Sequence, residues 1–184
     1  MDESRLIAGC RRNDLRCQKE LYDLMHPKML GVCMRYAADR DQAQELLQEG
    51  FIKVFRKIDS FKGDGSFEGW VRKIMVNTSL EHFRREKAKA IEVGLEKESL
   101  MVVSNEPTAL SEMAAADIMR AVSQLPQGYK MVFNLFAIEG YSHEEIAIEL
   151  DISVNTSYSQ YHRAKAMLQK MITGEKKATV KKAM

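Results

Sequence analysis

The sequence predicts an all-α protein made of two small helical domains joined by a linker, with a helix-turn-helix as the second domain. Three observations lead to this prediction. Apolar residues recur at helical spacing along most of the 184 residues, and no segment alternates as an amphipathic strand would. The helical period is interrupted between residues 89 and 111. Near the C-terminus, a short helix, a tight turn and a longer helix follow one another.

The composition favours a protein that stays in the cytoplasm. A hydrophobic share of 45% is enough for packed cores. No apolar run approaches the ~20 residues needed to cross a bilayer, and the segment Met1–Arg5 lacks the features of a secretory signal. The three cysteines are an odd number and match no common zinc spacing with His26, so we expect neither disulfides nor a metal site. Nothing in the sequence calls for a cofactor.

We expect the first domain over residues 1–88. Helices are predicted over residues 4–10 and 19–36. Asn13 and Asp14 break the helical pattern, and Pro27 permits only a kink or a new start.

A helix from Asp41 has two different faces. Its apolar face consists of Ala43, Leu47, Phe51, Val54, Phe55 and Ile58. The other face is an acidic strip, which we define as Glu45, Gln48, Glu49 and Ile52. Such a strip suits a basic groove on a partner. Alternatively, Glu49 simply pairs with Lys53 one turn further on.

A glycine-containing loop then leads to Ser66, a good N-cap for the next helix. The predicted buried stripe of this helix is Phe67, Trp70, Val71, Ile74, Met75 and Thr78. The predicted outward face is Lys73, Asn77, Leu80, Glu81 and Arg84. Trp70 is expected to anchor the core. Asn77 is a poor helix former, so an outward amide there favours a contact with a base or a backbone.

Residues 89–111 are expected to be an interdomain linker, followed by the second domain over 112–174 and a basic tail over 175–184. The apolar patch Leu100–Val103 in the linker either rests on this chain or fills a partner's groove. In the second domain, a helix from Ser111 ends at Leu125–Pro126, and another continues through Phe136 to the stop at Gly140.

The helix-turn-helix itself is predicted from Ser142 onward. Ser142 and Glu145 match a capping box, residues 151–153 form the turn, and a long helix covers residues 154–171. Its inward residues are Ser157, Tyr161, Ala164 and Leu168, and its outward residues are Asn155, Tyr158, Ser159, His162, Arg163 and Lys165. The outward set suits contacts with phosphates and bases.

The net charge of +2 says little about binding partners, but basic residues concentrate over residues 72–89 and from Arg163 to the end. By themselves these stretches are best explained as solvated helix faces. Combined with the helix-turn-helix, they favour DNA binding.

Three stretches resemble a known family, the bacterial RNA polymerase sigma factors of the extracytoplasmic-function (ECF) type. The chain's opening reads LIAGCRRNDLRCQKELYDLMHPKML and is similar to the family's first helices. Its second region is matched by DQAQELLQEGFIKVFRKIDSFKGDGSFEGWVRKIMVNTSLEHFRR. Its fourth is matched by LPQGYKMVFNLFAIEGYSHEEIAIELDISVNTSYSQYHRAKAML. Two unrelated long motifs in the right order make the resemblance specific.

The resemblance implies three binding surfaces. Core polymerase would be bound by Glu45, Leu46, Gln48, Glu49 and Ile52. The promoter's −10 element, with a base flipped from the non-template strand, would be bound by Lys62, Gly63, Asp64, Ser66, Phe67, Lys73, Asn77, Arg84 and Arg85. The −35 element would be bound by Asn155, Thr156, Tyr158, Ser159, Gln160, His162, Arg163 and Lys165.

The long helix departs from the family pattern. Asp151 stands where the family usually has glycine, and residues 155–160 stand where it has a Gly-Thr-Val-Lys-Ser-Arg run. Two cations are thereby missing, so we expect weaker −35 binding with a flatter salt dependence. Asp151 can adopt the left-handed conformation that the turn requires.

The expected function is therefore that of a sigma factor without catalysis of its own. It would bind core RNA polymerase, direct it to promoters through the −35 and −10 elements, and assist melting. An anti-sigma factor is a candidate third partner. The alternative is a free-standing helix-turn-helix regulator of duplex DNA, which leaves the acidic strip and the glycine loop unexplained. An enzyme is not supported, because no phosphate-binding loop, metal cluster or activated nucleophile is recognisable.

Overall fold

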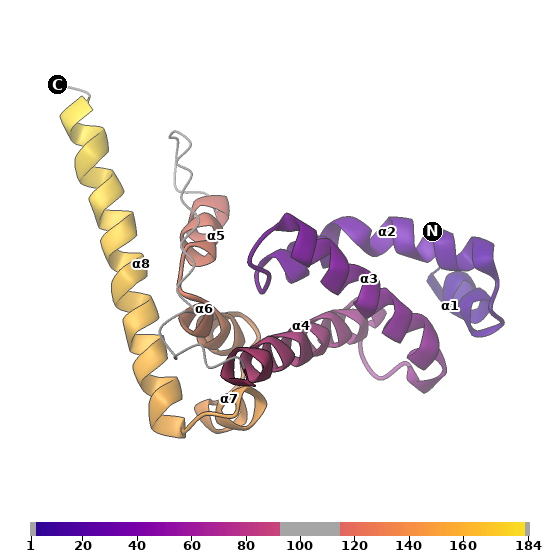
Figure 1. Cartoon of the computed structure of the whole chain (residues 1–184). Helices are drawn as coiled ribbons and strands as arrows, with labels where there is room; N and C mark the ends of the chain where they lie inside the picture. Colours follow the sequence, from indigo (N-terminus) through magenta and orange to yellow (C-terminus); the bar gives the residue numbers. More distant parts are fainter. Residues whose placement is uncertain (1–2, 93–114, 183–184) are drawn as a thin grey trace. The chain divides into compact units, whose positions relative to one another are not determined.

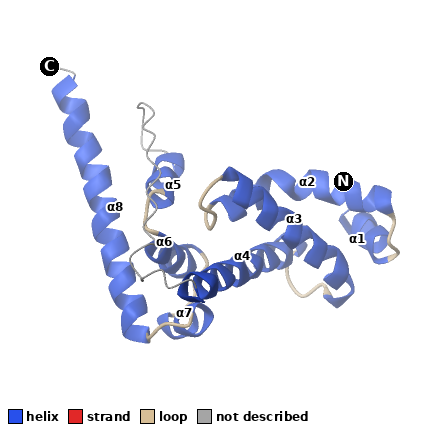
Figure 2. Ribbon diagram, viewed as in Figure 1, coloured by secondary structure: helices blue, strands red, loops and turns tan. Residues whose placement is uncertain are grey.

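The structure, a computed structural model, describes residues 3–92 and 115–182 (Figure 1). Within these ranges every regular element is a helix, which confirms the all-α prediction (Figure 2). No helix in the described ranges is long and apolar enough to cross a membrane. The chain divides into two compact units, residues 1–86 and 87–184. Most of the predicted linker, including Leu100–Val103, lies outside the described residues.

The first unit is built from α1 (Glu3–Arg11), α2 (Leu15–Met34), α3 (Arg40–Lys57), the short 3₁₀ turn η1 (Ile58–Ser60) and the part of α4 (Phe67–Glu92) that ends at Glu86. α2 begins earlier than predicted because Asp14 caps it, with its carboxylate accepting the N–H groups of Arg16 at 2.8 Å and Cys17 at 3.3 Å. α2 also passes through Pro27 as one helix, so a new start there is excluded.

The core of the first unit largely follows the predicted apolar faces. The α3 residues Ala43, Leu47, Phe51 and Val54 are buried, as are Ile58 of η1 and Phe67, Val71, Met75 and Thr78 of α4. One prediction is wrong: Leu80 is fully buried rather than outward. The middle of α4 buries a wider face than a single stripe, because Val76 and Ser79 are also covered. Trp70 is only half-buried. The cysteines are buried as free thiols.

The second unit contains α5 (Ala115–Ser123), α6 (Gln127–Phe133), the π-helical turn η2 (Asn134–Ile138), α7 (His143–Leu150) and α8 (Val154–Lys182). Its core includes Val122 and Leu125 before α6, packed with Ala164 and Leu168 of α8. The predicted helix through Phe136 widens into η2, where the N–H of Glu139 reaches the carbonyl of Asn134 at 3.0 Å. α8 extends past its predicted end, to Lys182.

The helix-turn-helix is formed by α7 and α8. Ser142 and Glu145 make the predicted capping box, with reciprocal hydrogen bonds of 3.2 Å and 2.8 Å. Asp151 ends α7 in the left-handed conformation (φ 50°, ψ 61°), as the turn was expected to require. The hydroxyl of Ser153 then accepts the N–H of Thr156 at 3.0 Å and begins α8.

Candidate protein and nucleic-acid interfaces

The acidic strip of α3 lies on the surface of the first unit. Glu45, Gln48 and Ile52 are exposed, and Glu49 is half-buried. Leu46 is different, because only 2% of it is exposed. Its side chain packs into the core beneath the strip, so a part for Leu46 in binding core polymerase stays a prediction.

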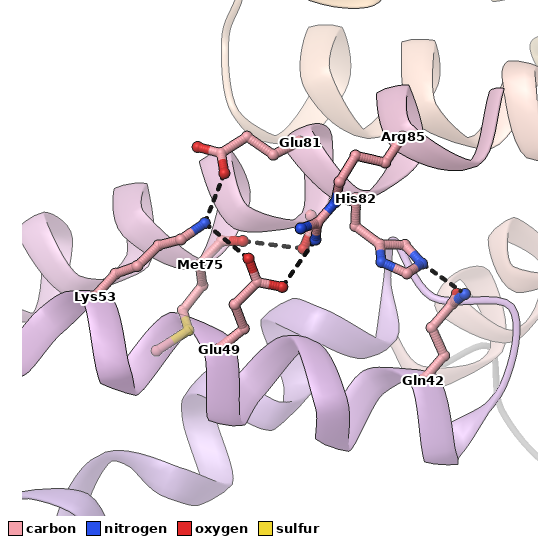
Figure 3. Close-up of polar contacts among 8 residues, drawn as sticks. Gln42, Glu49, Lys53, Met75, Glu81, His82 and Arg85 are labelled. Carbon is pink, nitrogen blue, oxygen red and sulfur yellow. Dashed lines mark hydrogen bonds and ion pairs between the residues drawn. The ribbon is translucent and has the colours of Figure 1, made fainter. Parts of the chain in front are cut away.

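Glu49 stands at the centre of an ion-pair network between α3 and α4 (Figure 3). Its carboxylate accepts hydrogen bonds from Lys53 Nζ at 3.1 Å and from Arg85 Nη2 at 2.9 Å. The same Lys53 ammonium donates to Glu81 at 2.7 Å. The simple Glu49–Lys53 pair considered above is therefore present, but it is one part of a larger arrangement.

The network shifts the pKa values of Glu49 and Lys53. Burial disfavours the charged form of Glu49, but the hydrogen bonds from Lys53 and Arg85 outweigh it and hold the pKa of this carboxyl below its usual value. Burial likewise opposes the charge on Lys53, but Glu81 and Glu49 outweigh it and raise its pKa. Both groups therefore remain charged at neutral pH.

The glycine loop between η1 and α4 is exposed and fixed at both ends. Lys62, Gly63, Asp64 and Ser66 are open to solvent. Gly63 and Gly65 have φ values of 88° and 92°, which side-chain-bearing residues rarely adopt. The sequence between the two ends therefore forms a tight, accessible loop.

Three aromatic rings hold the ends of this loop together. The ring of Phe61 lies 5.1 Å from that of Phe67 and 5.6 Å from that of Trp70, and the Phe67 and Trp70 rings stack at 5.6 Å. Phe67 is only 1% exposed. Phe67 therefore anchors the loop from inside, and its predicted contact with the −10 element stays a prediction.

Sequence reasoning missed a further anchor, Arg11 of α1. Its Nη2 donates to the carbonyl oxygen of Phe61 at 2.6 Å, across 50 positions of sequence. On the other side of the loop, the Ser66 hydroxyl accepts the N–H of Gly69 at 3.1 Å, as an N-cap should. No local pattern marks Arg11, because its partner is a main-chain atom of a distant segment.

The outward surface of α4 carries the cationic and amide residues that were predicted there. Lys73, Asn77 and Arg84 are exposed and recur at spacings that place them along one side of the helix. Arg85 is exposed too, but its guanidinium is bonded to Glu49.

On α8, most of the predicted outward residues are indeed exposed: Asn155, Tyr158, Ser159, His162, Arg163 and Lys165. Thr156 is half-buried and its hydroxyl lies 2.8 Å from that of Ser153. Gln160 is also half-buried, and Arg163 donates to the hydroxyl of Tyr129 on α6 at 3.3 Å.

The start of α8 is joined to α7 by a buried histidine that sequence reasoning did not single out. His143 Nδ1 and the hydroxyl of Ser157 are 2.8 Å apart, and Ser157 is fully buried. The available signal was the serine on the predicted inward face of α8, since a buried hydroxyl requires a partner.

Comparison with known proteins agrees with this arrangement. The model of sigma-70 region 2 matches residues 21–89, and that of sigma-70 region 4 matches residues 115–168. The RNA polymerase sigma-H factor of Pseudomonas aeruginosa is 28% identical, covering 92% of this chain and 93% of that protein. The ECF RNA polymerase sigma-E factor of Escherichia coli K12 is 29% identical, covering 91% of this chain and 92% of that protein.

A solved structure is similar in fold. It is that of the sigma factor RpoE from Bartonella quintana in complex with the anti-sigma factor NepR, with 23% identity, a TM-score of 0.50, and coverage of 84% of this chain and 96% of that one. The two family models together span more than half of the chain, one on each structural unit. The chain therefore belongs to the sigma-70 family, as an ECF sigma factor that directs RNA polymerase to promoters.

Proposed function

We propose that the acidic strip, Glu45, Gln48, Glu49 and Ile52, binds core RNA polymerase. Carboxylates around an exposed isoleucine are complementary to a basic groove with an apolar centre. Leu46 supports this surface from beneath.

The loop over residues 62–66 and the outward side of α4 would bind the −10 element. The observation that carries this proposal is the loop itself, which is exposed at its tip and anchored at both ends by Phe61 and Phe67. Holding a flipped base requires a preformed pocket, since unstacking costs a few kcal/mol. Lys73, Asn77, Arg84 and Arg85 would follow the backbone of the melted strand and so assist promoter melting.

The exposed side of α8 would bind the −35 element as duplex DNA, with its N-terminal residues in the major groove. The protein would work in the cytoplasm with the polymerase, and it would need no cofactor and perform no catalysis of its own. An anti-sigma factor is a candidate partner by analogy with the Bartonella relative. Residues 1–88, 89–111, 112–174 and 175–184 would serve as the polymerase and −10 domain, the linker, the −35 domain and a basic tail.

The test is specific initiation. The full chain would be mixed with core polymerase and a library of promoter fragments, and transcripts would be sequenced. Initiation from fragments sharing two spaced elements is expected only when both proteins are present. Tight binding to duplex DNA without polymerase, combined with no initiation, would instead favour a free-standing regulator.

A further inference from the structure

His143 occupies the first position of α7 and is only 5% exposed. Its Nδ1 lies 2.8 Å from the hydroxyl of Ser157, one turn into α8. Because both groups are buried, their hydrogen bond is shielded from competing water and fixes the imidazole ring relative to α8.

The imidazole ring in turn supports Tyr158. The centroids of the two rings are 3.9 Å apart, with their planes tilted by 36°. On η2, the ring of Phe136 stacks on the same imidazole. The two ring centroids are 4.4 Å apart and the ring planes are tilted by 17°. Phe136, His143 and Tyr158 thus form a continuous series of rings, in which the buried imidazole lies between a half-buried phenylalanine and an exposed tyrosine.

Tyr158 is 48% exposed at the outer end of this series. Contact with His143 on one face of the tyrosine ring reduces the number of rotamers open to it, which favours one direction for its hydroxyl. A phenol hydroxyl both donates and accepts, and the structure shows no hydrogen bond to this one from any residue that it describes. A lysine at the same position would be a mobile point charge suited to phosphates of any sequence.

We propose that Tyr158 is a specificity-determining residue of the −35 contact, whose hydroxyl bonds the edge of one base in the major groove, and that His143 is the residue that positions it. This inference rests on the proposed binding of α8 to the −35 element. In place of the two cations missing from residues 155–160, the helix would then have one directional hydrogen bond from Tyr158. Binding to DNA of any sequence would be weaker, and the preference for one sequence would be stronger.

The first experiment uses Tyr158→Phe, which removes only the hydroxyl. The polymerase holoenzyme, assembled with the full chain, would be bound to a promoter library in which the −35 element is randomised. The variant is expected to lose about 3- to 10-fold of discrimination at one base pair, with other positions unchanged. An unaltered preference at every base pair would overturn the assignment of Tyr158.

The second experiment tests positioning by His143. His143→Ala is expected to lose discrimination at the same base pair, and adding Tyr158→Phe should cause little further loss. His143→Phe combined with Ser157→Ala keeps a supporting ring and leaves no hydroxyl without a partner, so it should restore the preference. If His143 had only a structural role, His143→Ala would weaken binding to all −35 sequences alike. The His143→Phe and Ser157→Ala combination would then not restore a preference at one base pair. A uniform loss in either variant, an unchanged profile in His143→Ala, or no restored preference in the combination overturns the positioning role.

A control is provided by Ile148→Ala on the same helix, an exposed residue outside the proposed contacts, which should leave the profile unchanged. Thermal unfolding of each variant would identify His143→Ala as misfolded. In that case the His143→Phe and Ser157→Ala combination decides the matter: a preference retained at that base pair supports positioning by a ring, and a preference lost in the folded combination overturns it. If the wild-type holoenzyme shows no −35 preference, the proposed function fails. If the wild-type holoenzyme shows a −35 preference and Tyr158→Phe retains it at every base pair, only this inference fails.

Discussion

The carboxylate of Glu49 on α3 and the guanidinium of Arg85 on α4 are joined by a hydrogen-bonded ion pair of 2.9 Å. The first residue belongs to the surface proposed for polymerase and the second to the surface proposed for the −10 element. Both proposed sites therefore share one ion pair. If a cationic group on polymerase bound the Glu49 carboxylate, the Arg85 guanidinium would become available to a DNA phosphate. Thermodynamic linkage requires each partner to change the other's affinity by the same factor.

Glu49→Gln is expected to release Arg85 in the free protein. Binding of a single-stranded −10 oligonucleotide should tighten by roughly 1.4- to 5-fold, since a partly exposed ion pair contributes about 0.2–1 kcal/mol. Fluorescence anisotropy of the labelled oligonucleotide measures this change. Glu45→Gln removes the same charge from the same strip but has no ion pair to Arg85. Equal tightening in both variants would show a general charge effect instead of linkage.

Arg11→Ala should weaken recognition of the −10 element without touching DNA directly. Loss of the hydrogen bond to the Phe61 carbonyl would free the start of the loop, and a loss of about 1 kcal/mol corresponds to roughly 5-fold weaker binding of the −10 oligonucleotide. Arg12→Ala, an exposed neighbour of equal charge, is the matched control. Similar losses in the two variants would argue that charge, and not anchoring, is responsible.

The sequence was sufficient for the fold because helical period and caps are local. Ser66, Ser142 and Asp151 all act as their residue types predict. Leu80 was misplaced because one stripe was assumed for α4, whereas the buried face is wider in the middle of that helix. Burial depends on which elements surround a helix, and no single segment contains that information.

The candidate site was less predictable from sequence, since its geometry depends on contacts between distant segments. Leu46 and Phe67 lie within motifs shared with the family, but their side chains face the core. Motif membership does not distinguish a residue that touches a partner from one that supports it. Conversely, Arg11 and His143 lie outside the predicted sites and become visible only through their partners, Phe61 and Ser157.

Tyr158→Lys is expected to make binding of the −35 element more sensitive to salt. Each additional neutralised phosphate contributes ~0.9 to the slope of log affinity against log salt concentration. Filter binding of the wild type and the variant to one duplex, from 50 to 200 mM salt, would give both slopes. Equal slopes would mean that the new ammonium finds no phosphate.

Gly9→Ala should destabilise the first unit because α1 and α2 are close at this point. A Cβ at Gly9 would lie 2.6 Å from the Cβ of Cys17, a contact that rotation of the thiol cannot relieve. We expect a loss of about 1–3 kcal/mol in the free energy of unfolding, measured with urea. Gly31→Ala is the matched control, since a Cβ there meets nothing within 4 Å, and it should stabilise α2 by roughly 0.5–1 kcal/mol. Equal stability changes would contradict the close approach.

Lys130 should make the stability of the second unit depend on pH. Burial lowers its pKa to about 8, whereas lysine in an unfolded chain titrates near ~10.4. Between these values the unfolded state holds more protons, so the free energy of unfolding rises with pH. Lys130→Met should remove this rise and increase the free energy of unfolding at pH 7. Urea unfolding of both proteins at several pH values from neutral to about 9.5 would compare them, and parallel pH profiles would contradict the expectation.

The bond between Arg11 and Phe61 also sets an order of events during protein synthesis. α1 leaves the ribosome first, and the carbonyl that Arg11 binds is made 50 residues later. The glycine loop cannot reach its anchored form until the chain from α1 to Phe61 has emerged and folded. A newly made chain can therefore acquire the anchored form of this loop only after both α1 and Phe61 have left the ribosome.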